Sequence, residues 1–252
     1  MTQLKTQTAV LAVLAAFAGG AQAQAAAPQA GGSLSIATIY RTVAPLSFDA
    51  ADWNWKFNHD TGLMYEALFA ADLSKSKGHG GPNAFILDGY LPPSAIRGEL
   101  AESWQMLDNP RRVEVKLRKG VMFPEKKDVM AARELTADDV VYSYTRYNTS
   151  PKRQVGYTDY IEKVEAKDKH TVVFTFNKFI ADWDYRFGNG FFSGIMPKEV
   201  ADAGAGNWKN VNGTGPFMLT NVVQGNSLTF SKNPVYWDKD VIGGKEYKLP
   251  FV

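Results

Sequence analysis

Residues 135–147, Leu-Thr-Ala-Asp-Asp-Val-Val-Tyr-Ser-Tyr-Thr-Arg-Tyr, predict a capped helix between two strand regions. Thr136 can cap the first turn, and the two acids that follow stand where the helix dipole favours negative charge. Val140, Tyr144 and Tyr147 recur at helical spacing and form one apolar face. Such a face has to be covered by a sheet or by other helices.

A half-buried strand is expected before this helix. Val113, Val115 and Leu117 alternate with charged residues, which is the period of a strand with one face in the core. The dipeptide 119–120, Lys-Gly, closes this strand.

Hairpins are expected after the helix. Residues 160–166 and 171–176 predict one hairpin, and residues 217–223 and 227–231 predict another. A first short strand is expected at residues 34–38. Together these segments predict an α/β fold, with a mixed sheet rather than a purely parallel one.

Two other stretches give weaker signals. Residues 72–96 contain several glycines and prolines, which predict a long surface loop. Residues 123–134 are expected to be irregular or short-helical.

The N-terminus has the pattern of a secretory signal peptide. Residues 9–18 are an uninterrupted apolar run, too short to span a bilayer, and residues 21–23 (Ala-Gln-Ala) supply the small residues that a signal peptidase reads. We expect cleavage after Ala23, a flexible leader at residues 24–33, and a periplasmic mature protein. A buried alanine-rich helix is the alternative, but such a helix would show polar residues at regular spacing.

Composition excludes several classes of protein. The 252-residue chain has no cysteine, so disulfides, a lipid anchor at a cleavage-site cysteine and zinc–thiolate sites are excluded. The formal net charge is +2, and the basic residues are scattered. We therefore expect no nucleic-acid partner.

Motifs for catalysis are also missing. The three histidines are far apart, and no nucleophile elbow, phosphate-binding loop or dinucleotide fingerprint occurs. We expect no enzyme activity, no catalytic residue, no metal site and no cofactor. A carboxylate pair brought together by folding is left open.

Aromatic side chains are the most conspicuous feature. Residues 52–57 and 182–187 both interleave large rings with charged or amide groups, as small-molecule pockets do. For the second segment, we favour the interpretation that one ring packs in the core. For the first segment, composition leaves core packing and ligand contact equally open.

Several motifs occur in one order along the chain. They are residues 31–34 (Gly-Gly-Ser-Leu), 64–68 (Met-Tyr-Glu-Ala-Leu), 100–104 (Leu-Ala-Glu-Ser-Trp), 116–123 (Lys-Leu-Arg-Lys-Gly-Val-Met-Phe), 135–143 (Leu-Thr-Ala-Asp-Asp-Val-Val-Tyr-Ser), 212–217 (Asn-Gly-Thr-Gly-Pro-Phe) and 233–237 (Asn-Pro-Val-Tyr-Trp). In this order, over residues 31–252, they resemble the family 5 extracellular solute-binding proteins, which include oligopeptide, dipeptide and nickel binders.

The resemblance implies a periplasmic binding protein type II-like fold with two lobes around a ligand cleft. It implies a helix at residues 64–68, with the cleft bordered by the segment before it. The ligand contacts expected from it are Trp53, Asn54, Trp55, Tyr157 and, as a poorer match, Tyr160.

The resemblance also implies a domain organisation. Residues 34–252 would be the first lobe, with a main-sheet subdomain at 34–52 and 156–252 and an inserted subdomain at 53–155. The second lobe is expected to be absent, because the chain stops where the family crosses into it. Two local departures are a longer stretch at residues 72–98 and residues 124–135 in place of the usual His-Asp-Gly-x-Pro motif.

The expected function is that of a monomeric periplasmic protein that binds short peptides or peptide-like solutes and delivers them to an ABC permease. Within binding proteins, the alternative ligand is nickel or a metallophore. From other classes, the alternatives are a secreted hydrolase with carboxylates brought together by folding and, disfavoured by the absence of repeats, a structural or adhesive protein.

Overall fold

The computed structural model describes residues 47–51, 61–75, 77, 81–82, 92–107, 111–151, 153, 156, 158–181, 183–184, 194–242 and 245–248. The expected signal peptide and the expected strand at residues 34–38 lie outside these ranges. Within them, no helix is long and apolar enough to cross a membrane.

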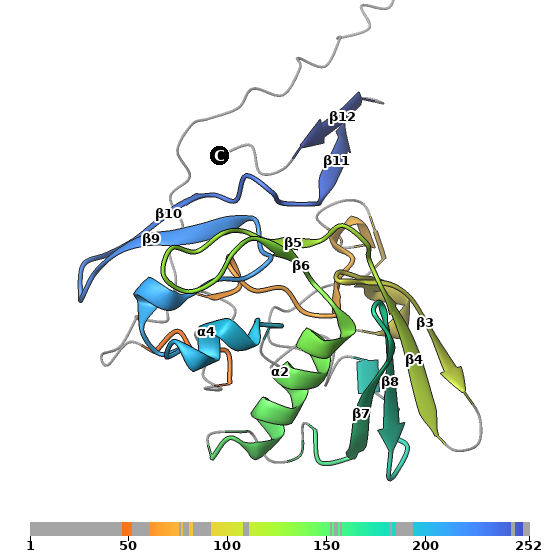
Figure 1. Cartoon of the computed structure of the whole chain (residues 1–252). Coiled ribbons are helices and arrows are strands. Elements are labelled where there is room, and N and C mark those ends of the chain that lie inside the picture. Colours follow the sequence, from red (N-terminus) through yellow and green to blue (C-terminus); the bar gives the residue numbers. More distant parts are fainter. Residues whose placement is uncertain are drawn as a thin grey trace, which may run out of the picture.

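A four-stranded sheet forms one side of the molecule (Figure 1). Its strands, in spatial order, are β3 (Ala101–Leu107), β4 (Arg112–Leu117), β8 (Thr171–Phe176) and β7 (Ile161–Asp168). All three pairings are antiparallel, whereas a mixed sheet was expected. The two-residue turn between β7 and β8 explains why these two strands pair antiparallel, because a parallel pair needs a long crossover connection.

The helix α2 (Ala137–Thr149) begins where the sequence predicts. Thr136 is its N-cap, and the Asp139 Oδ2 atom accepts a hydrogen bond from the Thr136 backbone N at 2.9 Å. The Arg133 guanidinium donates to both oxygens of Asp139, at 2.7 and 2.9 Å, and also contacts Glu199. Through the ion pairs of Arg133, the N-terminus of α2 is therefore joined to β6 (Arg133–Glu134) and α4 (Lys198–Asp202).

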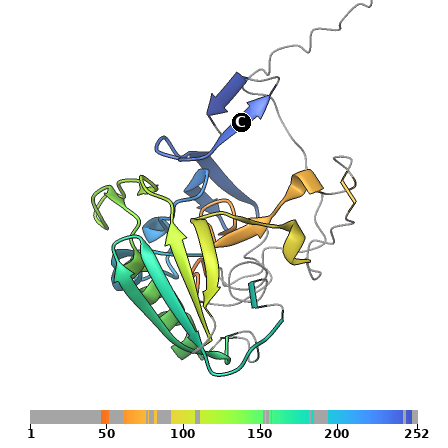
Figure 2. The ribbon, with the colours of Figure 1, turned by 90° about the vertical axis from the view of Figure 1, so that its right-hand side faces the viewer.

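The predicted apolar face of α2 covers one face of the sheet (Figure 2). Val140, Tyr144 and Tyr147 are all buried. The Tyr144 ring meets Phe174 of β8 edge-on, with centroids 4.9 Å apart. Helix and sheet therefore share one core.

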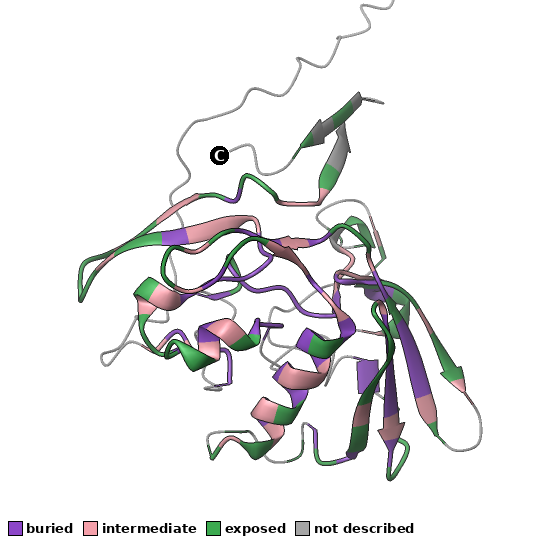
Figure 3. Ribbon diagram, in the orientation of Figure 1, coloured by how far each residue is buried: buried purple, intermediate pink, exposed green. Residues whose placement is uncertain are grey.

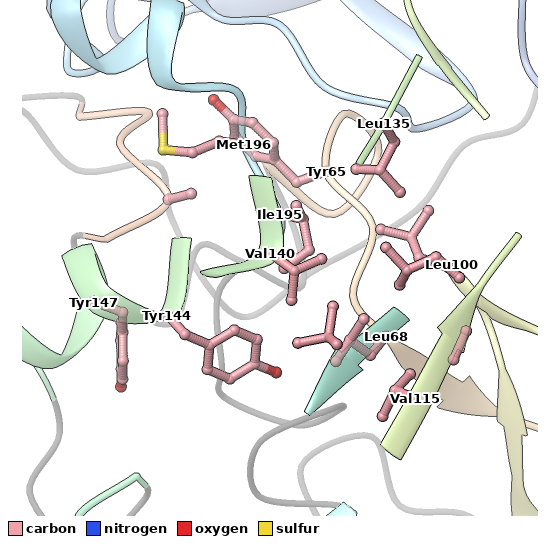
Figure 4. Close-up of a cluster of buried hydrophobic side chains, with 14 of the residues drawn as sticks. Tyr65, Leu68, Leu100, Val115, Leu135, Val140, Tyr144, Tyr147, Ile195 and Met196 are labelled. Carbon is pink, nitrogen blue, oxygen red and sulfur yellow. The ribbon is translucent and has the colours of Figure 1, made fainter. Parts of the chain in front are cut away.

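The core continues from α2 into the middle of the molecule, where buried residues gather (Figure 3). Part of it is drawn in Figure 4, with side chains from α2, from β4 and from connecting segments distant in sequence: Tyr65, Leu68, Leu100, Val115, Leu135, Val140, Tyr144, Tyr147, Ile195 and Met196.

The described residues also form four two-stranded antiparallel pairs. The hairpin predicted at residues 217–231 is confirmed. The strands are β1 (Phe69–Ala71) with β2 (Ile96–Gly98), β5 (Met122–Phe123) with β6, β9 (Phe217–Val223) with β10 (Ser227–Lys232), and β11 (Lys239–Ile242) with β12 (Lys245–Lys248). Short 3-10 turns are η2 (Leu73–Lys75), η4 (Pro93–Ala95) and η5 (Trp208–Asn210).

The helix expected at residues 64–68 is wrong. This segment is a non-helical stretch that leads into β1. Its carbonyls bond to distant segments: Glu66 O accepts from Ile195 N at 2.8 Å, and Ala67 O accepts from Leu100 N at 3.1 Å. In a helix, these carbonyls would accept hydrogen bonds from amides of the same segment. Here they accept from distant segments that enclose residues 64–68, and their hydrogen-bonding capacity is satisfied without a helix.

The two segments with weak signals also acquire structure. Residues 123–134, expected to be irregular or short-helical, form a turn between β5 and β6, closed by a bridge between Lys126 and Met130. In the expected loop at residues 72–96, the two described ends are held together, because Asp72 N donates to Ala95 O at 2.8 Å.

Strand pairing crosses one expected domain boundary. The sheet takes β3 and β4 from the range expected as the inserted subdomain, and β7 and β8 from the range expected as the main sheet. The two ranges therefore share one sheet in this structure.

Replacing the capping acid tests the importance of the α2 N-terminus. Asp139→Ala removes the bond to Thr136 N and a buried partner of Arg133, so we expect the free energy of unfolding to fall by about 2–4 kcal/mol. Asp138→Ala, at an exposed acid in the same turn, should cost no more than about 1 kcal/mol. Urea unfolding of both variants measures this, and equal losses would contradict a special role for Asp139.

Candidate functional site

Four of the five predicted ligand contacts cannot be placed. Trp53, Asn54, Trp55 and Tyr157 lie outside the described residues, so their role stays a prediction.

Tyr160 is placed in the core. Its side chain is fully buried, and its hydroxyl donates to the backbone O of Trp183 at 3.1 Å. Its ring lies 5.3 Å from that of Phe176, in an edge-on contact. This position gives Tyr160 a packing role and leaves no exposed surface for a ligand.

The interpretation of residues 182–187 is supported at Trp183. The Trp183 ring is buried, with its centroid 6.0 Å from the rings of Phe69 and Phe176. One ring of this aromatic segment therefore belongs to the core.

An ion pair holds the chain just before the predicted ligand segment. The Arg146 guanidinium, near the end of α2, donates through both terminal nitrogens to the Asp49 carboxylate, and the NH2–Oδ2 distance is 2.5 Å. Asp49 Oδ1 also accepts from Ala51 N at 2.9 Å. The two residues lie 97 positions apart, so no local pattern in the sequence indicates this pair.

Three of the quoted sequence motifs meet at one place, which we call the motif junction: residues 64–68, 212–217 and 233–237. Backbone hydrogen bonds join the first two, since Gly215 N donates to Met64 O at 2.8 Å and Phe217 N donates to Leu63 O at 3.0 Å. The buried Asn233 joins the last two, donating from Nδ2 to Gly215 O at 2.9 Å.

Glycine is required where these backbones touch. A Cβ atom on Gly213 would lie 2.1 Å from Met64 O, and one on Gly215 would lie 2.7 Å from Leu63 O. Both distances are below any normal contact of a carbon with an oxygen. Glycine is therefore needed at both positions because it has no side chain to fill this space.

A buried carboxyl group lies at the centre of the junction. Glu66 is 3 % exposed, and Trp237 Nε1 donates to its two oxygens at 3.0 and 3.1 Å. The Tyr236 hydroxyl reaches the same carboxyl at 3.3 Å. The carboxyl therefore ties residues 236–237 to a segment some 170 positions earlier.

A second acid, Glu99, lies beside the first. Its Oε2 atom accepts from Ala67 N at 2.7 Å, and Arg118 Nε donates to its backbone O at 2.6 Å. The Arg118 guanidinium also stacks 4.7 Å from the Trp237 ring centroid, a favourable cation–π position.

Burial controls the ionisation of these acids. Burial, together with the nearby Glu99 charge, raises the pKa of Glu66 to about 8, against the opposing hydrogen bonds from Trp237 and Tyr236. Burial likewise raises the pKa of Glu99 to about 7. Burial beside Glu66 also raises the pKa of Tyr236, so its hydroxyl remains a donor. A neutral Glu66 at pH 7 suits an apolar setting.

The paired acids are arranged as an anchor. Both Glu66 oxygens are occupied by the Trp237 indole, and Glu99 is occupied by a backbone amide. In the described part of the chain, no group of three or more His, Asp or Glu residues could hold a metal ion.

Known proteins resemble this chain in sequence and in fold. The profile of the bacterial extracellular solute-binding proteins, family 5 Middle, matches residues 95–249. Di/tripeptide-binding protein 2 of Pseudomonas aeruginosa (strain UCBPP-PA14) is 29% identical, in an alignment that covers 89% of this chain and 41% of that protein. The dipeptide-binding protein of Escherichia coli (strain K12) is 30% identical, over 55% of this chain and 29% of its own length.

A solved structure agrees with these matches. The ABC transporter-associated periplasmic binding protein DppA from Helicobacter pylori, in complex with the peptide STSA, superposes with a TM-score of 0.57 at 25% identity, covering 83% of this chain and 39% of that one. This chain therefore spans about two fifths of the length of the relatives that match most of it.

The close approach at Gly213 can be tested directly. Gly213→Ala would force the Met64 backbone to move, so we expect a fall in unfolding free energy of at least about 3 kcal/mol, or failure to fold. Gly206→Ala is the control, because a Cβ there meets only Ser47 Oγ at an ordinary 3.6 Å. Similar yield and melting temperature for both variants would show that the junction is not tightly packed.

The raised pKa of Glu66 predicts a pH dependence. Because the folded-state pKa, about 8, exceeds the ordinary value of 4.5, the stabilisation is complete below pH 4.5 and is lost as the pH rises through about 8. Glu66→Gln should flatten the fall in unfolding free energy between pH 5 and pH 8.5. Glu102→Gln, at an exposed position of β3, should leave the profile unchanged. Parallel profiles for the wild type and Glu66→Gln would refute the assignment.

Proposed function

Since this chain belongs to the bacterial extracellular solute-binding proteins of family 5, we propose that it is part of the substrate-binding component of an ABC importer for short peptides or peptide-like solutes. The observation that carries the proposal is the 29% identity to a di/tripeptide-binding protein across 89% of the chain. The structural likeness to a peptide-bound periplasmic protein supports it.

We propose that the ligand lies against the segment that contains Trp53, Asn54 and Trp55, with Tyr157 as a further contact. The Asp49–Arg146 ion pair supports this assignment, because it fixes the chain directly before that segment to α2. Aromatic rings there would stack on the ligand, and amide groups would orient it.

The remaining parts of the proposal concern export and partners. Residues 1–23 would direct the chain to the periplasm, where it would act as a monomer that releases its ligand to a membrane permease. No nucleic acid and no cofactor is part of this proposal. Residues 34–252 would form the first lobe of a two-lobe protein that closes on its ligand.

Hydrolysis is the competing function from another class, and one experiment separates the two. The purified protein is incubated with a defined mixture of di- and tripeptides at millimolar concentration, and the peptides are analysed by mass spectrometry. A binding protein retains peptides through ultrafiltration and returns them intact. Shortened peptides would identify a hydrolase, and no retention of any peptide by a chain extended to the full length of its relatives would contradict the peptide-binding proposal.

We expect this chain alone to bind a peptide weakly or not at all, because the alignments cover less than half of each relative and ligand pockets usually enclose most of their ligand.

The tryptophan assignment predicts a loss of affinity. In a chain extended to the full length of its relatives, Trp53→Ala or Trp55→Ala, whichever residue is the true contact, should weaken peptide binding by about 1–3 kcal/mol, as the loss of a buried aromatic anchor does. Phe179→Ala is the control, because that ring is 54 % exposed. Calorimetric titration measures the change. Unchanged affinity in both tryptophan variants, with the fold intact, would rule the assignment out.

A further inference from the structure

The turn between β5 and β6 is held by backbone hydrogen bonds. It includes residues that stand in place of the His-Asp-Gly-x-Pro motif. Lys126 and Met130 exchange backbone hydrogen bonds at 3.0 and 2.9 Å. Asp128, at the tip, has a φ of 61°, a left-handed conformation that few residues other than glycine adopt. The backbone of Lys126 is therefore fixed.

This turn is fastened to the motif junction. The buried Asn212 donates from Nδ2 to Pro124 O at 2.7 Å, which joins the turn to the segment before β9. A cavity of about 110 Å³ lies between the two. Its walls are partly apolar and partly polar, and they include Met64, Glu125, Lys126, Asn212, Gly213 and Leu219.

Lys126 is a half-buried cation without a counter-charge among the described residues. Burial lowers the pKa of its ammonium group, and no neighbouring acid offsets that effect. Other lysines of the chain, such as Lys167 and Lys169, pair with carboxylates at 2.6–2.7 Å. Glu125 also lines the cavity, but its side chain is exposed to solvent, where its charge is screened.

We propose that this cavity is a binding site for a small oxyanion, a carboxylate or a phosphate, with the Lys126 ammonium as its counter-ion. An anion there would compensate for the hydration that the ammonium group loses on burial. The Asn212 amide, with one N–H beyond the bond to Pro124, is a second donor in the cavity wall. The proposal goes beyond the proposed function and does not depend on it.

The size of the cavity limits the ligand. A water molecule occupies about 30 Å³ of liquid, so 110 Å³ holds an anion of roughly four or five heavy atoms. Acetate and inorganic phosphate fit this range, whereas pockets for larger ligands have several hundred Å³. The cavity is therefore too small to hold a peptide.

Thermal unfolding at pH 7 and constant ionic strength tests the proposal, with sodium acetate or sodium phosphate replacing sodium chloride. Binding to the folded state should raise the melting temperature of the wild type by roughly 2–4 °C at saturation. Lys126→Met should abolish this rise and should itself melt higher than the wild type in chloride. Lys127→Met, the same change at the exposed neighbouring lysine, should respond as the wild type does.

The arms of the experiment identify the anion. A rise with acetate alone assigns a carboxylate site, a rise with phosphate alone assigns a phosphate site, and both together assign a general oxyanion site, provided that Lys126→Met removes the rise. An equal rise in all three proteins, or no rise in the wild type, would overturn the proposal. Should Lys126→Met fail to fold, NMR titration of the wild-type lysines decides: the pKa of Lys126 must rise when phosphate is added, and a constant value would refute the site.

Discussion

The hydrogen bonds between the buried Glu66 carboxyl and the Trp237 indole hold together parts of the chain that no local rule connects. One partner precedes the whole sheet and α2 in sequence, and the other follows β10. A carboxyl with so little exposure is tolerated because its oxygens have donors and because burial favours its neutral form. The junction therefore closes the fold around α2 and the sheet.

The close backbone contacts at the motif junction restrict which residues can occupy it, as the buried carboxyl does. Gly213 and Gly215 lie against the Met64 backbone so closely that a methyl group has no room. The same segment 64–68 supplies carbonyls to Ile195 and Leu100, so it is enclosed on several sides. Interiors packed at this density transmit a local change to all the segments that meet there.

The family assignment and the geometry describe different parts of the function. The described residues form the supports: the Asp49–Arg146 pair that holds the chain before the predicted ligand segment, and the junction that holds residues 236–237 before β11. The proposed peptide contacts depend on residues beyond these supports. The anion site proposed at Lys126 lies where the turn between β5 and β6 meets the motif junction.

The sequence by itself determined the elements whose signals are local. The cap at Thr136, the apolar face of Val140 and Tyr144, and the two predicted hairpins follow from periodicity and turn chemistry within a few residues. Only the tertiary structure decided that residues 64–68 are not helical, that Tyr160 is buried, and that Glu66 meets Trp237. Each of these depends on partners that are 23 to 171 residues away, and pairings at that range leave no periodic pattern in the chain.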